Sequence, residues 1–196
     1  MSRKVEFPPD GKRVFSSPVV VVSAWQATGT IIPATYACAT AQHETDFTTN
    51  EVDTEESGFV SKGIYQLSDE EAREAGMPGA NLLDLAIATA VLVNRATARA
   101  KQLMGAISLV SPLPPDLLAF LTVAHNQGPA AAMKTVAAHG LNWQGYKERN
   151  GGAMLLSLLA QPNEQDEETL DAKRRWWLSV FRYGDDAITG GRNSAS

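Results

Sequence analysis

Cysteine, histidine and aromatic residues are scarce in this chain, and their scarcity removes several classes of protein from consideration. The 196 residues include one cysteine, three histidines and 7% aromatic side chains. The single cysteine, Cys38, rules out an intramolecular disulfide framework, and no cysteine and histidine residues recur at zinc-binding spacing. We therefore expect no disulfide, no metal site and no cofactor.

The chain also lacks an excess of positive charge and a long hydrophobic run. Its 17 Lys and Arg residues stand against 22 Asp and Glu residues, for a net charge of −5, which argues against a nucleic-acid partner. The valine run at 19–22 is far shorter than the ~20 apolar residues that a membrane span needs. Prolines interrupt the N-terminal region that is superficially similar to a signal peptide. We expect no membrane span, and synthesis in the cytoplasm without a clear signal peptide.

Small and hydrophobic residues instead recur at helical spacing, which predicts a mainly α fold with one substantial core. The expected helices cover residues 33–47, 68–75, 82–104, 116–125, 129–140 and 153–160, and a last helix that Gly184 ends. The helix at 82–104 is the most apolar of these, so we expect it to be central. Ser68 and Glu71 have the spacing of a capping box, and Asn81 is the expected N-cap of the helix at 82–104. Residues 19–25 are rich in valine and predict a short strand or extended segment, and residues 48–62 predict a loop or a small hairpin.

Changes in composition divide the chain into four segments. Residues 1–17 are polar and contain proline, which predicts an N-terminal arm, and residues 18–160 form the main domain. Residues 161–185 begin as an acidic linker and continue as a C-terminal helix, whose aromatic stripe is expected to pack on the domain. Residues 186–196 are expected to be a disordered tail.

One predicted helix carries an acidic side chain on its inward face. Ala37, Cys38, Ala41 and Glu44 follow the spacing of one helix face turned toward a core. Burying an ionised carboxylate is costly, so such a group is either paired with a cation or has its pKa raised until it holds a proton near neutral pH. The second state is that of a general acid. The residues alone leave both a buried ion pair and a catalytic acid open.

The acidic segment 48–62 also has two interpretations. It is either a solvated surface loop, or it lies over the site of Glu44 and supplies a second carboxylate from Asp53, Glu55 or Glu56. Asp69 is a further candidate. The sequence does not choose among them.

Three motifs follow one another along the chain: QHETDF at 42–47, GIYQ at 63–66 and AHNQGP at 124–129. In this order they resemble motifs of the lysozyme-like superfamily, which includes soluble lytic transglycosylases and goose-type lysozymes, over about residues 31–150. The resemblance implies an α+β lysozyme-like fold. In that fold a helical bundle surrounds a central buried helix, a small β-hairpin or loop region lies over the cleft, and residues 18–160 form the catalytic domain.

The same resemblance implies a peptidoglycan-cleaving glycosidase that acts on the β-1,4 bond between N-acetylmuramic acid and N-acetylglucosamine. Glu44 would protonate the glycosidic oxygen. Asp53 or Glu56 would assist as the second catalytic carboxylate in hydrolysis, whereas without such a group the muramyl 6-hydroxyl would form a 1,6-anhydro product. The substrate-binding residues would be Thr45, Tyr65, Gln66, His125 and Asn126. His125 stands where the family usually has a tyrosine whose hydroxyl reaches the catalytic glutamate.

The expected partner is a peptidoglycan glycan strand, and the expected setting is lysis or penetration of the bacterial cell wall by a phage. Virion proteins or a secretion machine would then carry the enzyme to the periplasm. The alternative is a catalytically inactive lysozyme-fold protein that binds glycan or serves as a structural protein of the virion. The histidine at position 125 keeps that alternative open.

Overall fold

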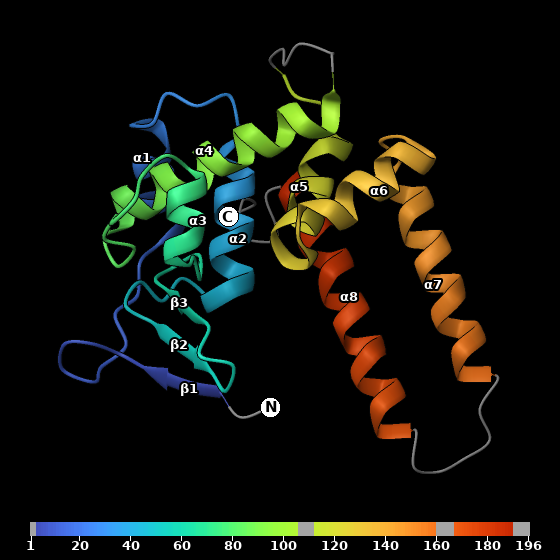
Figure 1. Cartoon of the computed structure of the whole chain (residues 1–196), viewed down its shortest axis with the longest axis horizontal. Coiled ribbons are helices and arrows are strands. Elements are labelled where there is room, and N and C mark those ends of the chain that lie inside the picture. Colours follow the sequence, from blue (N-terminus) through green and yellow to red (C-terminus); the bar gives the residue numbers. More distant parts are fainter. Residues whose placement is uncertain (1–2, 106–111, 160–166, 190–196) are drawn as a thin grey trace.

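The computed structural model describes residues 3–105, 112–159 and 167–189. Within these ranges the protein is mainly helical with one three-stranded antiparallel sheet, which confirms the mainly α prediction (Figure 1). The strands are β1 (Arg3–Glu6), β2 (Val52–Glu55) and β3 (Val60–Lys62). The helices are α1 (Pro18–Gln26), α2 (Ala34–Thr45), α3 (Asp69–Glu74), α4 (Leu85–Met104), α5 (Pro115–Gln127), α6 (Pro129–His139), α7 (Trp143–Leu159) and α8 (Glu167–Thr189).

α5 is more completely buried than the helix predicted at 82–104, although both contact five helices. Every residue of α5 from Leu117 to Ala124 is buried, because α2, α4, α6, α7 and α8 all contact this helix. The predicted helix corresponds to α4, which keeps an exposed face at Asn94 and Ala98. α4 also contacts five helices, α1, α2, α3, α5 and α6, and the more continuous apolar sequence of α5 accounts for its greater burial.

The valine run forms a helix, so the strand predicted at 19–25 is wrong. The Ser17 side chain accepts a hydrogen bond from the Val20 amide, and Pro18 occupies the first turn, where its missing N–H costs nothing. Val21 is fully buried, and the Trp25 indole one turn later donates to the Ile32 carbonyl at 2.6 Å. The Ser17 cap, together with Val21 and Trp25 four residues apart on one face of the helix, therefore outweighs the β-propensity of valine.

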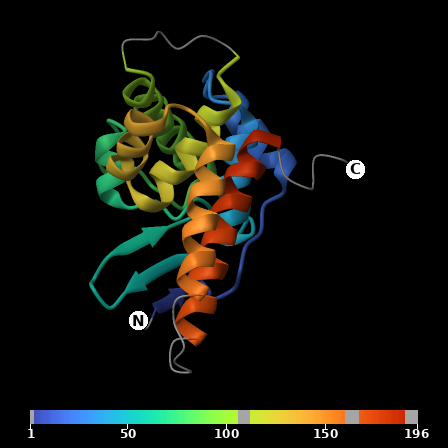
Figure 2. The same cartoon turned by 90° about the vertical axis from the view of Figure 1, so that its right-hand side faces the viewer.

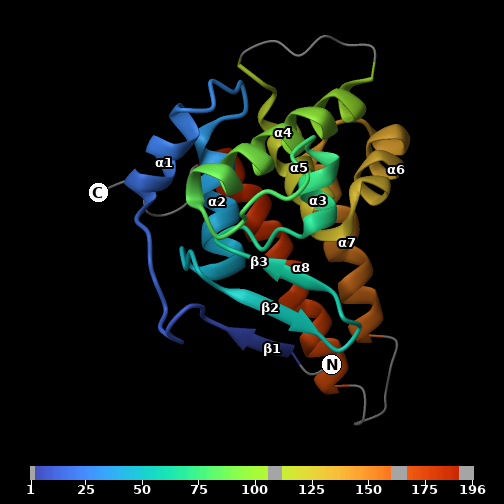
Figure 3. The ribbon, with the colours of Figure 1, turned by 60° about the vertical axis from the view of Figure 1, so that its left-hand side comes forward.

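The N-terminal arm is part of the sheet. β1 pairs antiparallel with β2, and β2 pairs antiparallel with β3, so the predicted hairpin at 48–62 is confirmed and gains a third strand (Figure 3). Asn50 holds the rest of the arm: its side chain accepts from the Val14 amide and donates to the carbonyls of Pro8 and Lys12. The polar composition of residues 1–17 gives no sign of these contacts, because strands pair through backbone groups, which do not depend on the side chains.

Several helix ends differ from prediction by a few residues. The capping box at Ser68 and Glu71 is confirmed, with both reciprocal hydrogen bonds formed. The cap of α4 is Asp84, not Asn81, because the Asp84 carboxylate accepts from the amides of Ala86 and Ile87. The Asn81 side chain instead accepts from the Leu83 amide within the preceding turn.

The C-terminal part of the chain is more helical than predicted. α7 begins at Trp143, ten residues before the helix predicted at 153–160, and it lies beside α8 (Figure 2). α8 continues through Gly184 to Thr189, so residues 186–189 are not part of a disordered tail, and residues 190–196 lie outside the described ranges. A β-carbon at Gly184 would meet the Trp143 ring at 2.1 Å. Gly184 therefore leaves room for the Trp143 ring to pack against α8, and it does not end the helix.

Gly184→Ala should therefore destabilise the protein, while Gly151→Ala should not. Both glycines lie inside helices, but a β-carbon at Gly151 would meet no atom within 4 Å. We expect Gly184→Ala to lower the free energy of unfolding by roughly 1–3 kcal/mol through overpacking. Gly151→Ala should raise it by up to about 1 kcal/mol through helix propensity. Urea denaturation followed by circular dichroism measures both, and equal effects would contradict the packing role of Gly184.

Candidate active site

A polar cavity of about 290 Å³ lies where the ends of α2 and α5 meet the β2–β3 hairpin. Half of the side chains that line it are carboxylates. The lining residues are Glu44, Glu51, Asp53, Glu55, Phe59, Ser61, Gln66, Glu71, His125 and Asn126. The cavity thus joins all three sequence motifs with the acidic segment between the first two.

The end of α2 places Glu44 in this cavity. Asp46 and Phe47 adopt left-handed backbone conformations, with φ of 50° and 65°, and their amides donate back to the carbonyls of Gln42 and Ala41. Left-handed residues other than glycine are strained, so the surrounding structure must hold them, and Phe47 is buried. The helix therefore ends at Thr45, one residue after Glu44, whose side chain is 21% exposed.

The strand β2 and the residue before it supply three carboxylates to one side. Glu51, Asp53 and Glu55 alternate along the chain, and side chains two residues apart in a strand point to the same face. Asp53 is the most enclosed of them, with 6% of the residue exposed, and pairs in register with Ser61 of β3. The sheet therefore holds Asp53 in place more firmly than a loop would.

A tight turn after β3 positions Gln66. Gly63 has φ of 73°, and a β-carbon there would meet the Leu82 carbonyl oxygen at 2.0 Å, so only glycine fits. Gln66 is itself left-handed, with φ of 47°. Its side chain donates to the Gly63 carbonyl at 3.0 Å and accepts from the Ser61 hydroxyl at 2.7 Å. The amide is therefore fixed in the cavity wall.

His125, in the last turn of α5, meets Glu44 directly. Its Nε2 lies 3.4 Å from the Glu44 Oε1, and its side chain is 6% exposed. Its Nδ1 is buried and has no hydrogen-bond partner among the described residues. The ring edge packs against Tyr183 of α8, with 6.4 Å between the ring centroids.

The cavity includes Glu44, Asp53, Gln66, His125 and Asn126 of the predicted site, but not Thr45, Tyr65 or Glu56. The Thr45 hydroxyl is buried and bonds to the carbonyls of Ala41 and Ile64. Tyr65 is fully buried, and its hydroxyl shares a hydrogen bond with Thr89. Glu56 is exposed in the hairpin turn. Each of the three is directed by its backbone away from the cavity.

Sequence reasoning missed Glu51, Phe59, Ser61 and Glu71 as lining residues. The alternation of acids at 51, 53 and 55 is a signal that identifies a strand face, but the segment was interpreted as a possible loop. Glu71 was assigned only to the capping box, and in the structure it also forms an ion pair with Arg95 at 2.5 Å. Ser61 carries no signal in the sequence, because only strand register brings it opposite Asp53.

Tyrosines and a histidine form the buried surroundings of Glu44. Burial raises the pKa of Tyr36 to about 12 and raises the pKa of Tyr183 well above its usual value, and the negative charge of Glu44 adds to both shifts. Burial also lowers the pKa of His43, against the opposing charge of Glu44. The His43 ring stacks on Tyr183, with centroids 4.2 Å apart, so it packs on the side of α2 that faces α8.

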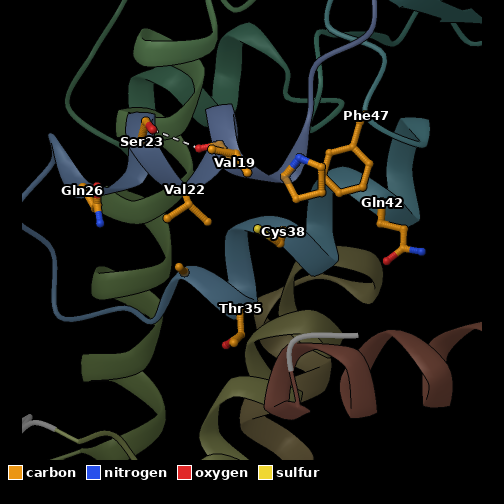
Figure 4. Close-up of a pocket in the computed structure, with 10 residues that line it drawn as sticks. Val19, Val22, Ser23, Gln26, Thr35, Cys38, Gln42 and Phe47 are labelled. Carbon is orange, nitrogen blue, oxygen red and sulfur yellow. Dashed lines mark hydrogen bonds between the residues drawn. The ribbon is translucent and has the colours of Figure 1, made fainter. Parts of the chain in front are cut away.

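A second cavity, of about 420 Å³, lies between α1 and α2 and is mostly apolar (Figure 4). Val19 and Val22 line it from α1, and Thr35, Cys38 and Gln42 line it from α2. Burial raises the pKa of the Cys38 thiol, which keeps it protonated and unreactive. Among the described residues, no carboxylate lines this cavity, whereas five line the first.

Within the described ranges, no group of three or more His, Cys, Asp or Glu side chains could hold a metal ion. No helix in the same ranges is long and apolar enough to cross a membrane. Comparison of the chain with protein-family models, with curated proteins and with solved structures gives no significant match. The function must therefore be argued from the site itself.

The buried tyrosines predict an unusual alkaline titration. The pKa of each of the four tyrosines is raised, that of Tyr36 to about 12. A raised folded-state pKa contributes stability that is fully present below the unfolded value of about 10 and is lost as pH rises through the folded value. Absorbance at 295 nm should show little tyrosinate near pH 10 and then a cooperative rise as the protein unfolds. A gradual titration centred near pH 10 would contradict the described burial.

Proposed function

We propose that the protein is a glycosidase that cleaves the β-1,4 bond between N-acetylmuramic acid and N-acetylglucosamine in peptidoglycan, with Glu44 as the general acid. The observation that carries the proposal is the single cavity in which Glu44 faces the carboxylates of β2. Two carboxylates across a cleft are the usual requirement for glycoside hydrolysis. Gln66, His125 and Asn126 line the same cavity and add polar groups suited to a sugar.

The environment of Glu44 supports an acid role. The negative end of the α2 dipole lies beside this side chain and disfavours its ionised form. Partial burial has the same effect, since a carboxylate loses hydration when it is enclosed. A proton held at Glu44 is then available to the glycosidic oxygen, which needs it as the bond to the leaving sugar breaks.

Asp53 is our choice for the second carboxylate. It lines the cavity and is held in a strand opposite Ser61, whereas Glu56 is exposed in the turn. In an inverting reaction, the ionised Asp53 would accept a proton from the water that attacks the anomeric carbon from the face opposite Glu44. Glu51 and Glu55 lie on the same face of the strand and keep the cavity acidic.

The lysozyme-like fold and its cellular setting belong to the same proposal. A mainly helical body, a small sheet beside the cleft and three ordered motifs that meet at one cavity all support it. In this setting the protein acts on the cell wall during lysis or penetration by a phage. Virion or secretion-machine proteins then deliver it to the periplasm.

The contact between His125 and Glu44 favours a second candidate function, a glycan-binding or virion structural protein without activity. A protonated imidazole 3.4 Å from the carboxylate would stabilise the ionised form of Glu44 and oppose proton donation. Cleavage of purified cell walls by the wild-type protein separates the two candidates. Binding of glycan without cleavage at every pH tested would favour the second.

Glu44→Gln should abolish cleavage while leaving the fold intact, because the amide keeps the size of the side chain but cannot supply the proton. We expect kcat to fall by roughly 10²–10⁴-fold, as for the loss of a general acid. Mass spectrometry of the products from purified peptidoglycan measures the turnover. Glu56→Gln is the matched control and should cleave at the wild-type rate. Unchanged turnover in Glu44→Gln would contradict the role of Glu44 as the general acid.

Asp53→Asn tests the second carboxylate. If Asp53 activates water, this variant should lose at least about tenfold in kcat, and the wild-type products should carry reducing ends. Products with 1,6-anhydro ends, together with near-normal turnover in Asp53→Asn, would identify an anhydro-forming transglycosylase instead. Circular dichroism of the variant is needed alongside, because Asp53 is buried.

A further inference from the structure

The two helices that carry Glu44 and His125 both rest on the C-terminal helix. α2 and α5 each contact α8, and the last turns of α2 and α5 bring the two side chains within 3.4 Å of one another. Figure 1 shows the upper end of α8 beside α5, and Figure 3 shows α8 passing behind α2. A shift of α8 would therefore move both halves of the candidate site.

Tyr183 is the α8 residue at this junction. It is 1% exposed, and its hydroxyl donates to the Thr40 hydroxyl of α2 at 2.8 Å. Thr40 uses its own proton on the Tyr36 carbonyl, so Tyr183 must be the donor. The raised pKa of Tyr183 keeps its proton in place. The same ring stacks on His43 and meets the edge of His125 at an interplanar angle of 89°.

His125 lacks the hydrogen bond that usually orients a functional histidine. Such a ring is normally held by a hydrogen bond to the nitrogen that does not face the reacting group. In this protein Nε2 faces Glu44, and Nδ1 is buried with no partner in the described part of the chain. Within the described residues, the contacts that orient the ring are then the one with Glu44 and the packing of the ring itself. Among the aromatic contacts, the ring that meets His125 is that of Tyr183.

We propose that Tyr183 is a positioning residue that sets the orientation of His125 toward Glu44 through ring contact, so that the C-terminal helix is a working part of the site. Its effect on turnover rests on the proposed function, whereas its effect on the His125 ring does not. The hydroxyl of Tyr183 anchors α2, and the ring orients His125. Removal of one or the other should therefore have different consequences.

Two substitutions separate the ring from the hydroxyl. Tyr183→Phe keeps the ring and loses the bond to Thr40, whereas Tyr183→Met keeps a similar buried volume and loses the ring. Trp176→Leu is the control, because Trp176 lies on the same helix and is 43% exposed. The readouts are kcat and KM on purified peptidoglycan and the ¹⁵N signals of the histidine side chains. The chain has three histidines, so His125→Gln assigns the His125 signals by their loss.

Tyr183→Met should move the His125 signals and lower kcat by roughly ten- to a hundredfold, the scale expected when a reacting group is misplaced. KM should change by less than about threefold, because Tyr183 does not line the cavity. Tyr183→Phe and Trp176→Leu should leave the His125 signals unchanged. In the His125→Gln background, Tyr183→Met should cost little more than His125→Gln alone, since the two act as a unit.

The outcomes are distinguishable. If the wild type does not cleave peptidoglycan but Tyr183→Met still moves the His125 signals, the proposed function fails and the positioning role stands. Folded Tyr183→Met with unchanged His125 signals would overturn the positioning role, whatever the activity. If Tyr183→Met does not fold, Tyr183→Phe decides: displaced His125 signals in that variant would also overturn it, because the ring is retained.

Discussion

A hydrogen bond from the Thr45 hydroxyl to the Ile64 carbonyl, at 3.0 Å, joins the two parts of the chain on which the candidate site depends. Thr45 follows Glu44 at the end of α2, and Ile64 lies in the turn that presents Gln66. The bond is buried, so its loss would leave a carbonyl without water to replace the donor. The bond therefore fixes the distance between Glu44, at the end of α2, and the turn that carries Gln66.

Several residues near this hydrogen bond have strained backbone conformations. Asp46, Phe47 and Gln66 are left-handed without being glycine, and each costs on the order of 1 kcal/mol or more. Gly63 approaches the Leu82 carbonyl so closely that no side chain fits. Strain of this kind persists only where packing holds it, and it is concentrated here beside the cavity. The helix end and the turn are thus held in position by the core behind them.

The sequence allowed the main features of the helical part to be predicted, because caps and spacing are local signals. The Ser68 capping box and the α2 boundaries needed only a few neighbouring residues. The strand predicted at 19–25 was wrong because the cap at Ser17 and the first-turn Pro18 favour a helix more strongly than the valines favour a strand. Gly184 was misjudged for a different reason. The ring that it accommodates belongs to Trp143, 41 residues earlier, and no local pattern reports such a contact.

The residues of the candidate site also fall into those that local motifs predicted and those that only the folded structure brings together. Glu44, Gln66, His125 and Asn126 were chosen from ordered motifs and do meet at one cavity. Thr45 and Tyr65 stand beside them in sequence, yet neighbouring side chains on a helix or turn point in different directions. Glu51 and Ser61 required the strand register. Tyr183 required the packing of a distant helix, since it lies 143 residues from its partner Thr40 in the chain. Long-range placement was therefore the part that the sequence could not supply.

His125 and the end of helix α2 act on the protonation of Glu44 in opposite directions. An N–H at the His125 Nε2, 3.4 Å from the Glu44 Oε1, would favour an ionised Glu44, and in either tautomer the buried Nδ1 has no partner among the described residues. The α2 dipole and partial burial favour the protonated carboxyl instead. In the proposed mechanism Glu44 releases its proton and recovers it in each turnover, and these opposing influences would keep it from being held in a single state. Asp53 lies in a strand away from any helix end, so the two carboxylates of the proposed pair have different surroundings in one cavity.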